Sequence, residues 1–126
     1  MPMPDAATTL TPAEIRSIAK AVGGSSALAR RLGVNPRTVR GWIEEPPRSA
    51  PERPEDLIDA WAVAVIERLV ADLTRQAVAA GTLAGRAVTL HAELPGGLRP
   101  ETEARMRTRL AHLAGAVLPN VNLRAA

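Results

Sequence analysis

The sequence predicts a mainly α protein, in which a bundle of short helices is followed by a long helix, two short strands and one further helix. Its 126 residues include no Phe, Tyr or Cys and only two Trp, so Leu, Val, Ile and Ala must build the core. Such an alanine-rich composition favours helix. Residues that start and end helices recur at short intervals before position 44, whereas an alternating apolar pattern begins after position 87.

Residues 11–22 predict the first helix. Thr11 and Glu14 have the spacing of a capping box, and Pro12 suits the first helical position. Two consecutive glycines follow and end the helix, because glycine accepts the left-handed backbone found at helix C-termini. The apolar face of this helix consists of Ile15, Ile18, Ala19 and Val22.

A second and a third helix follow, joined by a very short turn. Ser25 is expected to cap the second helix, and Gly33 to end it. Asn35 is expected to cap the third helix, with Pro36 at its first position, where the missing N–H costs nothing. So short a break fixes the angle between the helices, as is needed when the second one is presented to a partner. Val39, Trp42 and Ile43 would then cover the core and leave Arg37, Arg40 and Gly41 outside.

These two helices carry a small residue where they cross, a glycine in the turn and apolar residues on their inner faces. The pattern resembles the lambda-repressor-like (Cro-type) family of helix-turn-helix transcriptional regulators, over roughly residues 11–66. The resemblance implies that the third helix reads double-stranded DNA in the major groove. The residues in register with the family are Leu28, Ala29, Leu32, Gly33, Val34, Thr38, Val39 and Trp42.

We expect the DNA contacts on the second and third helices. Arg37 and Arg40 can each donate two hydrogen bonds to guanine. The N-terminus of the second helix can bind a phosphate through its backbone N–H groups, although plain capping explains Ser25 equally well. Either Arg30 or Arg31 is expected to be merely solvated. The expected DNA-binding residues are Ser25, Ser26, Arg30, Asn35, Arg37, Thr38 and Arg40.

The charge along the chain is uneven. Residues 1–43 carry six basic and two acidic side chains, residues 44–73 carry three and eight, and residues 74–126 carry seven and three. The first segment can therefore contact a polyanion, whereas the acidic middle segment should lie away from it. All but one of the basic residues are Arg, which suits bidentate contacts with phosphate and guanine.

Residues 54–126 are expected to form a dimerisation region, after a disordered lead (1–10), a helix-turn-helix domain (11–53) and a proline-rich stretch at its end (45–54). A long helix from Pro54 to about Ala80 is apolar nearly all round, so it needs a second partner, either another subunit or the C-terminal segment. A strand at 88–94, a helix at 100–117 and a short strand at 120–124 follow. Because a two-stranded sheet is marginal alone, pairing between two subunits would complete it. The expected dimer contacts are Trp61, Val65, Leu69, Leu90, Leu94 and Leu123.

Nothing in the sequence indicates an enzyme, a metal site or a cofactor. His91 and His112 lie far apart without ligand-like spacing, and the acidic residues from position 44 to 59 are better explained by a loop and a helix start. No apolar run approaches about 18 residues, so no membrane span is expected. The N-terminus lacks the features of a signal peptide, and a cytoplasmic location is expected.

The sequence therefore predicts a homodimeric repressor of phage or mobile-element origin that binds a palindromic operator and regulates its own operon. Anti-CRISPR-associated repressors are one group of this design. Two alternatives stay open. A small terminase-like or replication adaptor would form a ring, and an antitoxin would have a disordered C-terminal segment that binds a toxin.

Overall fold

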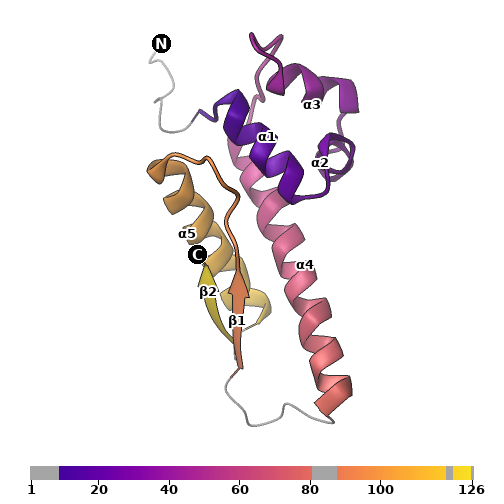
Figure 1. Cartoon of the computed structure of the whole chain (residues 1–126), viewed down its shortest axis with the longest axis vertical. Helices are drawn as coiled ribbons and strands as arrows, with labels where there is room; N and C mark the ends of the chain where they lie inside the picture. Colours follow the sequence, from indigo (N-terminus) through magenta and orange to yellow (C-terminus); the bar gives the residue numbers. More distant parts are fainter. Residues whose placement is uncertain (1–8, 81–87, 119–120, 126) are drawn as a thin grey trace.

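The computed structural model describes residues 9–80, 88–118 and 121–125, and within these ranges the chain is mainly helical, as predicted. Three short helices gather at the N-terminal end of a long one, which runs on along the molecule beside the remaining elements (Figure 1). In chain order the elements are α1 (Pro12–Ala21), α2 (Ser25–Leu32), α3 (Pro36–Ile43), α4 (Pro54–Ala80), β1 (Val88–Ala92), α5 (Pro100–Val117) and β2 (Val121–Ala125).

The helix starts follow from local hydrogen bonds, with one correction. The capping box of α1 is formed, since the Glu14 backbone N–H donates to the Thr11 hydroxyl at 3.1 Å and the Thr11 N–H to the Glu14 carboxylate at 3.0 Å. Ser25, in contrast, does not cap α2. Gly24, with φ +113°, holds the N-cap position instead, and Ser25 is the first helical residue.

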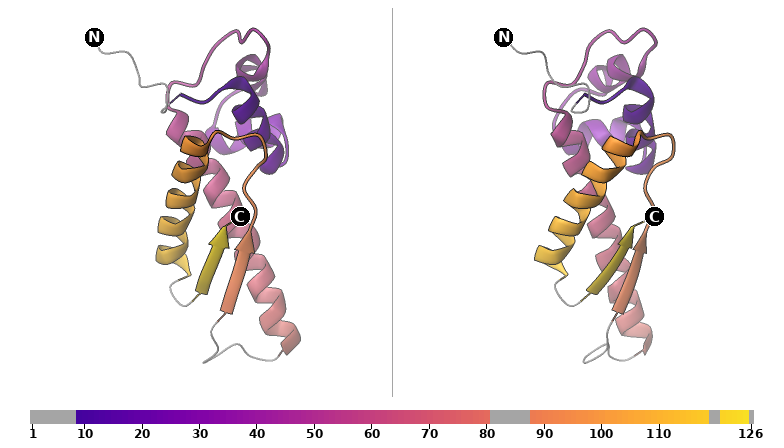
Figure 2. Two further views of the ribbon diagram at one scale, coloured as in Figure 1. Left: turned by 60° about the vertical axis from the view of Figure 1, so that its left-hand side comes forward. Right: turned by 90° about the vertical axis from the view of Figure 1, so that its left-hand side faces the viewer.

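The two strands form a parallel sheet, with Val88 opposite Val121 and Ala92 opposite Ala125. Parallel strands need a crossover connection, and α5 supplies it. Both strands point toward the α1–α3 end and lie along α4 and α5 (Figures 1 and 2). Ala92 is buried and Leu123 packs against the core, whereas the neighbouring His91 and Arg124 are exposed.

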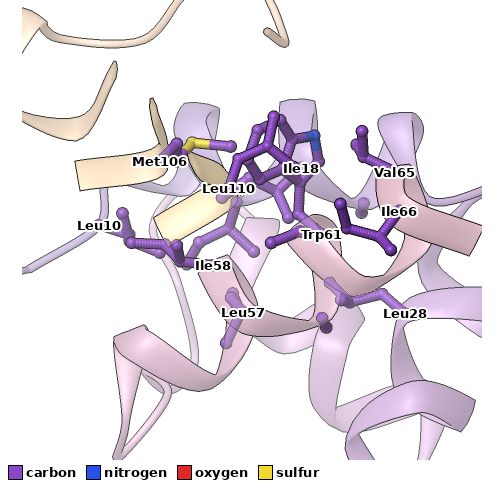
Figure 3. Close-up of a cluster of buried hydrophobic side chains, with 14 of the residues drawn as sticks. Leu10, Ile18, Leu28, Leu57, Ile58, Trp61, Val65, Ile66, Met106 and Leu110 are labelled. Carbon is purple, nitrogen blue, oxygen red and sulfur yellow. The ribbon is translucent and has the colours of Figure 1, made fainter. Parts of the chain in front are cut away.

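A single hydrophobic cluster joins all five helices. Trp61 of α4 lies within it, 1% exposed, among side chains from α1 and α5 (Figure 3). The division expected at residue 54 coincides with the start of α4, but the core is continuous across it. The labelled members are Leu10, Ile18, Leu28, Leu57, Ile58, Trp61, Val65, Ile66, Met106 and Leu110.

Two side chains lie elsewhere than expected. Leu10 was assigned to the disordered lead, yet it is buried in the core; residues 1–8 of that lead lie outside the described residues. Val117, which continues the helical spacing of Met106, Leu110 and Leu113 and would therefore be expected to face inward, is 53% exposed. It is the last residue of α5, and Leu118, which follows it, packs against the core instead.

The α4 and α5 helices run side by side and are joined by ion pairs. Arg109 Nε donates to Asp59 Oδ1 at 2.6 Å, and Arg105 pairs with Glu55. The two acids are four residues apart on α4 and the two arginines four apart on α5, so each pair bridges successive turns of parallel helices. The acidic start of α4 thus holds α5.

Among the described residues, no group of His, Cys, Asp or Glu has the arrangement of a metal site.

Glu14 makes a second set of contacts, which joins α1 to the start of α5. Its side chain is 1% exposed. Arg99, the N-cap residue of α5, donates its backbone N–H to Glu14 Oε2 at 3.0 Å and its Nε to Oε1 at 3.1 Å. A carboxylate buried this deeply persists only when its oxygens are hydrogen-bonded. The capping box and Arg99 together meet that need.

These contacts lower the pKa of Glu14. Burial alone raises it, but the nearby Thr102 hydroxyl, the Arg99 guanidinium and the backbone N–H groups of Thr11 and Arg99 outweigh burial, so the pKa falls from 4.5 to about 2. The Thr102 oxygen is itself fully buried and has no partner at strict hydrogen-bond geometry, so we attribute its effect to proximity and not to a hydrogen bond. Glu14 is therefore charged in the folded protein throughout the neutral range.

Within the described ranges, no helix combines the length and the apolar composition needed to cross a bilayer.

The lowered pKa of Glu14 predicts acid sensitivity. Because the pKa is about 2 in the folded protein and 4.5 when unperturbed, this group stabilises the fold fully above pH 4.5 and loses its effect as the pH falls toward 2. The stability difference between wild type and Glu14→Gln, from urea unfolding, should shrink by about 3 kcal/mol between about pH 6 and pH 2. Glu101→Gln, an exposed glutamate of α5, is the matched control for loss of an acid. A Glu14→Gln difference that does not change with pH would contradict the assignment.

Candidate nucleic-acid interface

The turn between α2 and α3 has the geometry predicted from Gly33. That residue has φ +72° and ψ +30°, the left-handed conformation. Its N–H donates to Arg30 O at 3.3 Å, and the next N–H, of Val34, donates to Ala29 O at 3.0 Å. These two bonds form a Schellman motif, which closes α2 and turns the chain sharply. Val34 is half-buried against the core and so fixes the turn in place.

The start of α3 is set by Asn35 and Pro36, as predicted. The Asn35 side chain accepts a hydrogen bond from the Arg37 backbone N–H at 2.8 Å, and Pro36 occupies the first turn. Val39 is completely buried and Trp42 nearly so, which orients the helix. The opposite side of α3 therefore faces away from the core, and Arg37 and Arg40 are exposed there.

Gly41 is the exception on that outer side, because it is buried although it was expected outside. The loop after α3 returns over it: Arg48 donates its backbone N–H to Gly41 O at 2.9 Å. A Cβ on Gly41 would lie 3.4 Å from Ser49 Oγ and 3.6 Å from the Arg48 guanidinium. These are ordinary contact distances, so a methyl group would fill the space between α3 and the loop, and a longer side chain at position 41 would meet Ser49 and Arg48.

No pattern in the sequence places Arg48 at this interface. Its position beside α3 depends on the path of a proline-rich loop, which no periodicity describes. The one indication in the sequence is Gly41, a residue without a side chain on the expected outer side of the helix, which is followed seven positions later by Arg48. The Arg48 side chain is 53% exposed and pairs with Glu44, Nε to Oε2 at 2.7 Å.

The arginines of this protein divide into paired and unpaired side chains. Arg16 and Arg68 donate to the backbone carbonyls that end α3 and α1. Most of the others form ion pairs, namely Arg31–Glu67, Arg48–Glu44, Arg75–Asp72, Arg99–Glu14, Arg105–Glu55, Arg107–Glu103 and Arg109–Asp59.

The unpaired group includes the three arginines that the sequence assigned to DNA. The side chains of Arg30, Arg37 and Arg40 are exposed and make no hydrogen bond or ion pair with any described residue; the same holds for the side chains of Lys20, Arg53 and Arg124. Residues 25–43, which we call the α2–α3 unit, contain no acidic residue. The unit therefore carries positive charge without a counter-ion of its own. Arg31, in contrast, is held by Glu67 at 2.7 Å, whereas the Arg30 side chain is in solvent.

The N-terminus of α2 is uncapped by any side chain. The backbone bond from Leu28 N–H to Gly24 O is the first of the helix, which leaves the N–H groups of the three preceding residues outside the helical ladder. Ser25 is half-buried and Ser26 exposed. Helix N-termini of this kind carry partial positive charge and bind anions.

The remaining candidates are less well placed. The Asn35 side chain is occupied by its cap, and Thr38 lies on the flank of α3, where it lines a cavity of 370 Å³ with Trp42 and the start of α4. Of the expected dimer contacts, Trp61, Val65 and Leu69 are buried within the chain, because α5 covers this part of α4. Leu94 lies beyond the end of β1 and, like Leu123, is half-buried; Leu90 pairs with Leu123 across the sheet.

No protein-family model, no curated protein and no solved structure matches this chain.

The left-handed conformation of Gly33 predicts that Gly33→Ala lowers the free energy of unfolding, whereas Gly115→Ala within α5 should raise it. Gly33 is exposed with open space around it, so Gly33→Ala meets no clash but must adopt a left-handed backbone, at a cost of about 1–2 kcal/mol. Gly115 also has open space but lies inside α5, where alanine should gain about 0.5–1 kcal/mol. Urea unfolding measures both. Stability changes of the same sign would refute the turn geometry.

Proposed function

We propose that this protein is a sequence-specific DNA-binding transcription regulator, with the α2–α3 unit as a helix-turn-helix and α3 as its recognition helix. One observation carries the proposal. Arg37 and Arg40 stand exposed and unpaired on the outer side of α3, in a unit without acidic residues, whereas most arginines elsewhere in the described chain have a partner.

The Arg37 and Arg40 side chains have no partner within the described chain, so they are available to bind a group outside it. An arginine on the exposed side of a helix in the major groove can donate two hydrogen bonds to guanine N7 and O6. The bare N-terminus of α2 supplies a neighbouring place for a phosphate, with Ser25 and Ser26 beside it. Arg30, which is also unpaired, would add a backbone contact and would help to fix the register on the duplex.

The acidic segment, residues 44–73, is compatible with DNA bound along α3. Glu55 and Asp59 hold α5, and Glu67 holds Arg31, so several of its carboxylates are neutralised within the protein. The core and α4 lie behind the recognition helix, on the side of Val39 and Trp42. Phosphate repulsion from these acids would thus be small.

We further propose a homodimer that binds a palindromic operator, as an autorepressor would. One short recognition helix covers about half a site, and two-fold pairing would place two of them roughly 34 Å apart. Because Trp61, Val65 and Leu69 are buried within one chain, the pairing has to use other surface. The two-stranded sheet offers it, since each of its strands has an open edge among the described elements.

A DNA-packaging or replication adaptor is the second candidate. The observation that favours it is α4, whose 27 residues extend well beyond α1–α3 and would suit a ring of subunits (Figure 1). An antitoxin is a weaker candidate, because the described part of the C-terminal segment packs against the core.

The recognition helix predicts a selective loss of binding. Arg37→Ala and Arg40→Ala should each weaken binding to a sequence selected by the wild-type protein from random duplexes, by about 1–3 kcal/mol, and should relax its preference at one position. Binding to unrelated DNA should fall less. Arg107→Ala, which removes an exposed arginine of α5, is the matched control. Fluorescence anisotropy measures all three, and wild-type affinity in both variants would overturn the assignment of α3.

The dimer predicts a particle of twice the chain mass. Light scattering of the full chain at micromolar concentration should give this value, a ring would give several times more, and a monomer would exclude the proposed pairing. The full chain is needed, because truncation after Ala50 removes Leu57, Ile58 and Trp61 from the core and would unfold the rest in any assembly state.

A further inference from the structure

We propose that Arg48 is an additional DNA contact. Its side chain lies on α3 where a side chain at position 41 would lie, and the Glu44 carboxylate binds its guanidinium until a DNA phosphate replaces that carboxylate. The inference rests on the proposed function, and the experiments below separate the two.

The position of Arg48 follows from α3 itself. Gly41 lies one helical turn after Arg37, so these two positions share one side of α3. Since Gly41 has no side chain, the guanidinium nitrogens of Arg48 come within 3.6 Å of its Cβ position. A loop residue thus extends the row of basic groups along α3.

The backbone, and not the ion pair, holds the loop there. The Arg48 N–H donates to Gly41 O at 2.9 Å, and Ser49 packs on the same glycine. The Arg48–Glu44 pair is about half exposed on both sides. Exposed pairs of this kind contribute little to stability. The Arg48 side chain can therefore exchange partners without moving the loop.

A phosphate is the natural replacement for Glu44. Guanidinium binds carboxylate and phosphate with the same planar donors. As a duplex approaches α3, its phosphates repel the Glu44 carboxylate and attract Arg48. We assign Arg48 to phosphate and not to a base, because it lies in the loop after α3 and not on the helix that would enter the major groove.

The first experiment replaces Arg48 by alanine and measures binding by anisotropy over a range of salt concentrations. Arg48→Ala should weaken binding to the selected sequence and to unrelated duplex by the same factor, and should reduce the slope of log K against log salt by about 1. Arg75→Ala is the matched control, since Arg75 is an exposed arginine paired with Asp72 on α4. It should change neither quantity.

The second experiment tests the exchange. Glu44→Gln should tighten DNA binding several-fold in the wild-type background but not in the Arg48→Ala background, because its effect acts through Arg48. Asp72→Asn is the control. A gain from Glu44→Gln that persists without Arg48 would mean simple removal of a negative charge and would overturn the exchange.

The outcomes separate the two proposals. If the wild-type protein binds no duplex, the proposed function fails. If Arg37→Ala and Arg40→Ala lose binding while Arg48→Ala retains it, the proposed function stands and the assignment of Arg48 fails. A loss confined to the selected sequence would also overturn it, in favour of a base contact. Unchanged thermal melting of Arg48→Ala establishes that the variant is folded.

Discussion

The buried carboxylate of Glu14 is the contact on which the rest of the arrangement depends. It closes the capping box of α1 and, at the same time, accepts from the backbone and side chain of Arg99, 85 positions later. A charge with 1% exposure requires all these donors, so α1 and the start of α5 have one permitted relative position. Once α5 is fixed there it packs along α4 and brings β2 back beside β1. The hydrogen-bonded start of α5 and its packing on α4 together precede the return of the chain to β2.

The fold also sorts the arginines by where their partners lie. Arg105 and Arg109 meet acids on α4, and Arg31 meets Glu67, whose pKa it lowers through a hydrogen bond and its charge. Arg30 is adjacent to Arg31 in sequence, but a helix points adjacent side chains in directions about 100° apart. It consequently faces away from α4 and stays unpaired, as do Arg37 and Arg40. These three unpaired arginines therefore add positive charge to the exposed sides of α2 and α3.

A continuous core links the proposed DNA-reading unit to the C-terminal segment. Trp61 and its neighbours on α4 contact residues from α1 on one side and α5 on the other. A second subunit that paired with the sheet would therefore set the position of α3 through packed side chains rather than through a flexible linker. The proline-rich loop after α3 fits the same picture, because its Arg48 is anchored on Gly41 by a backbone hydrogen bond.

The sequence by itself determined the elements whose causes are local. The capping box at Thr11, the cap at Asn35 and the left-handed Gly33 each depend on residues within about five positions, so their chemistry is readable directly. It also determined which two arginines stand on the outer side of α3, since helical periodicity settles that. The tertiary structure decided the second role of Glu14, the burial of Trp61 under α5 and the packing of Arg48 on Gly41. Each of these joins segments whose distance in space is set by how the helices pack, and residue spacing along the chain carries no record of that packing.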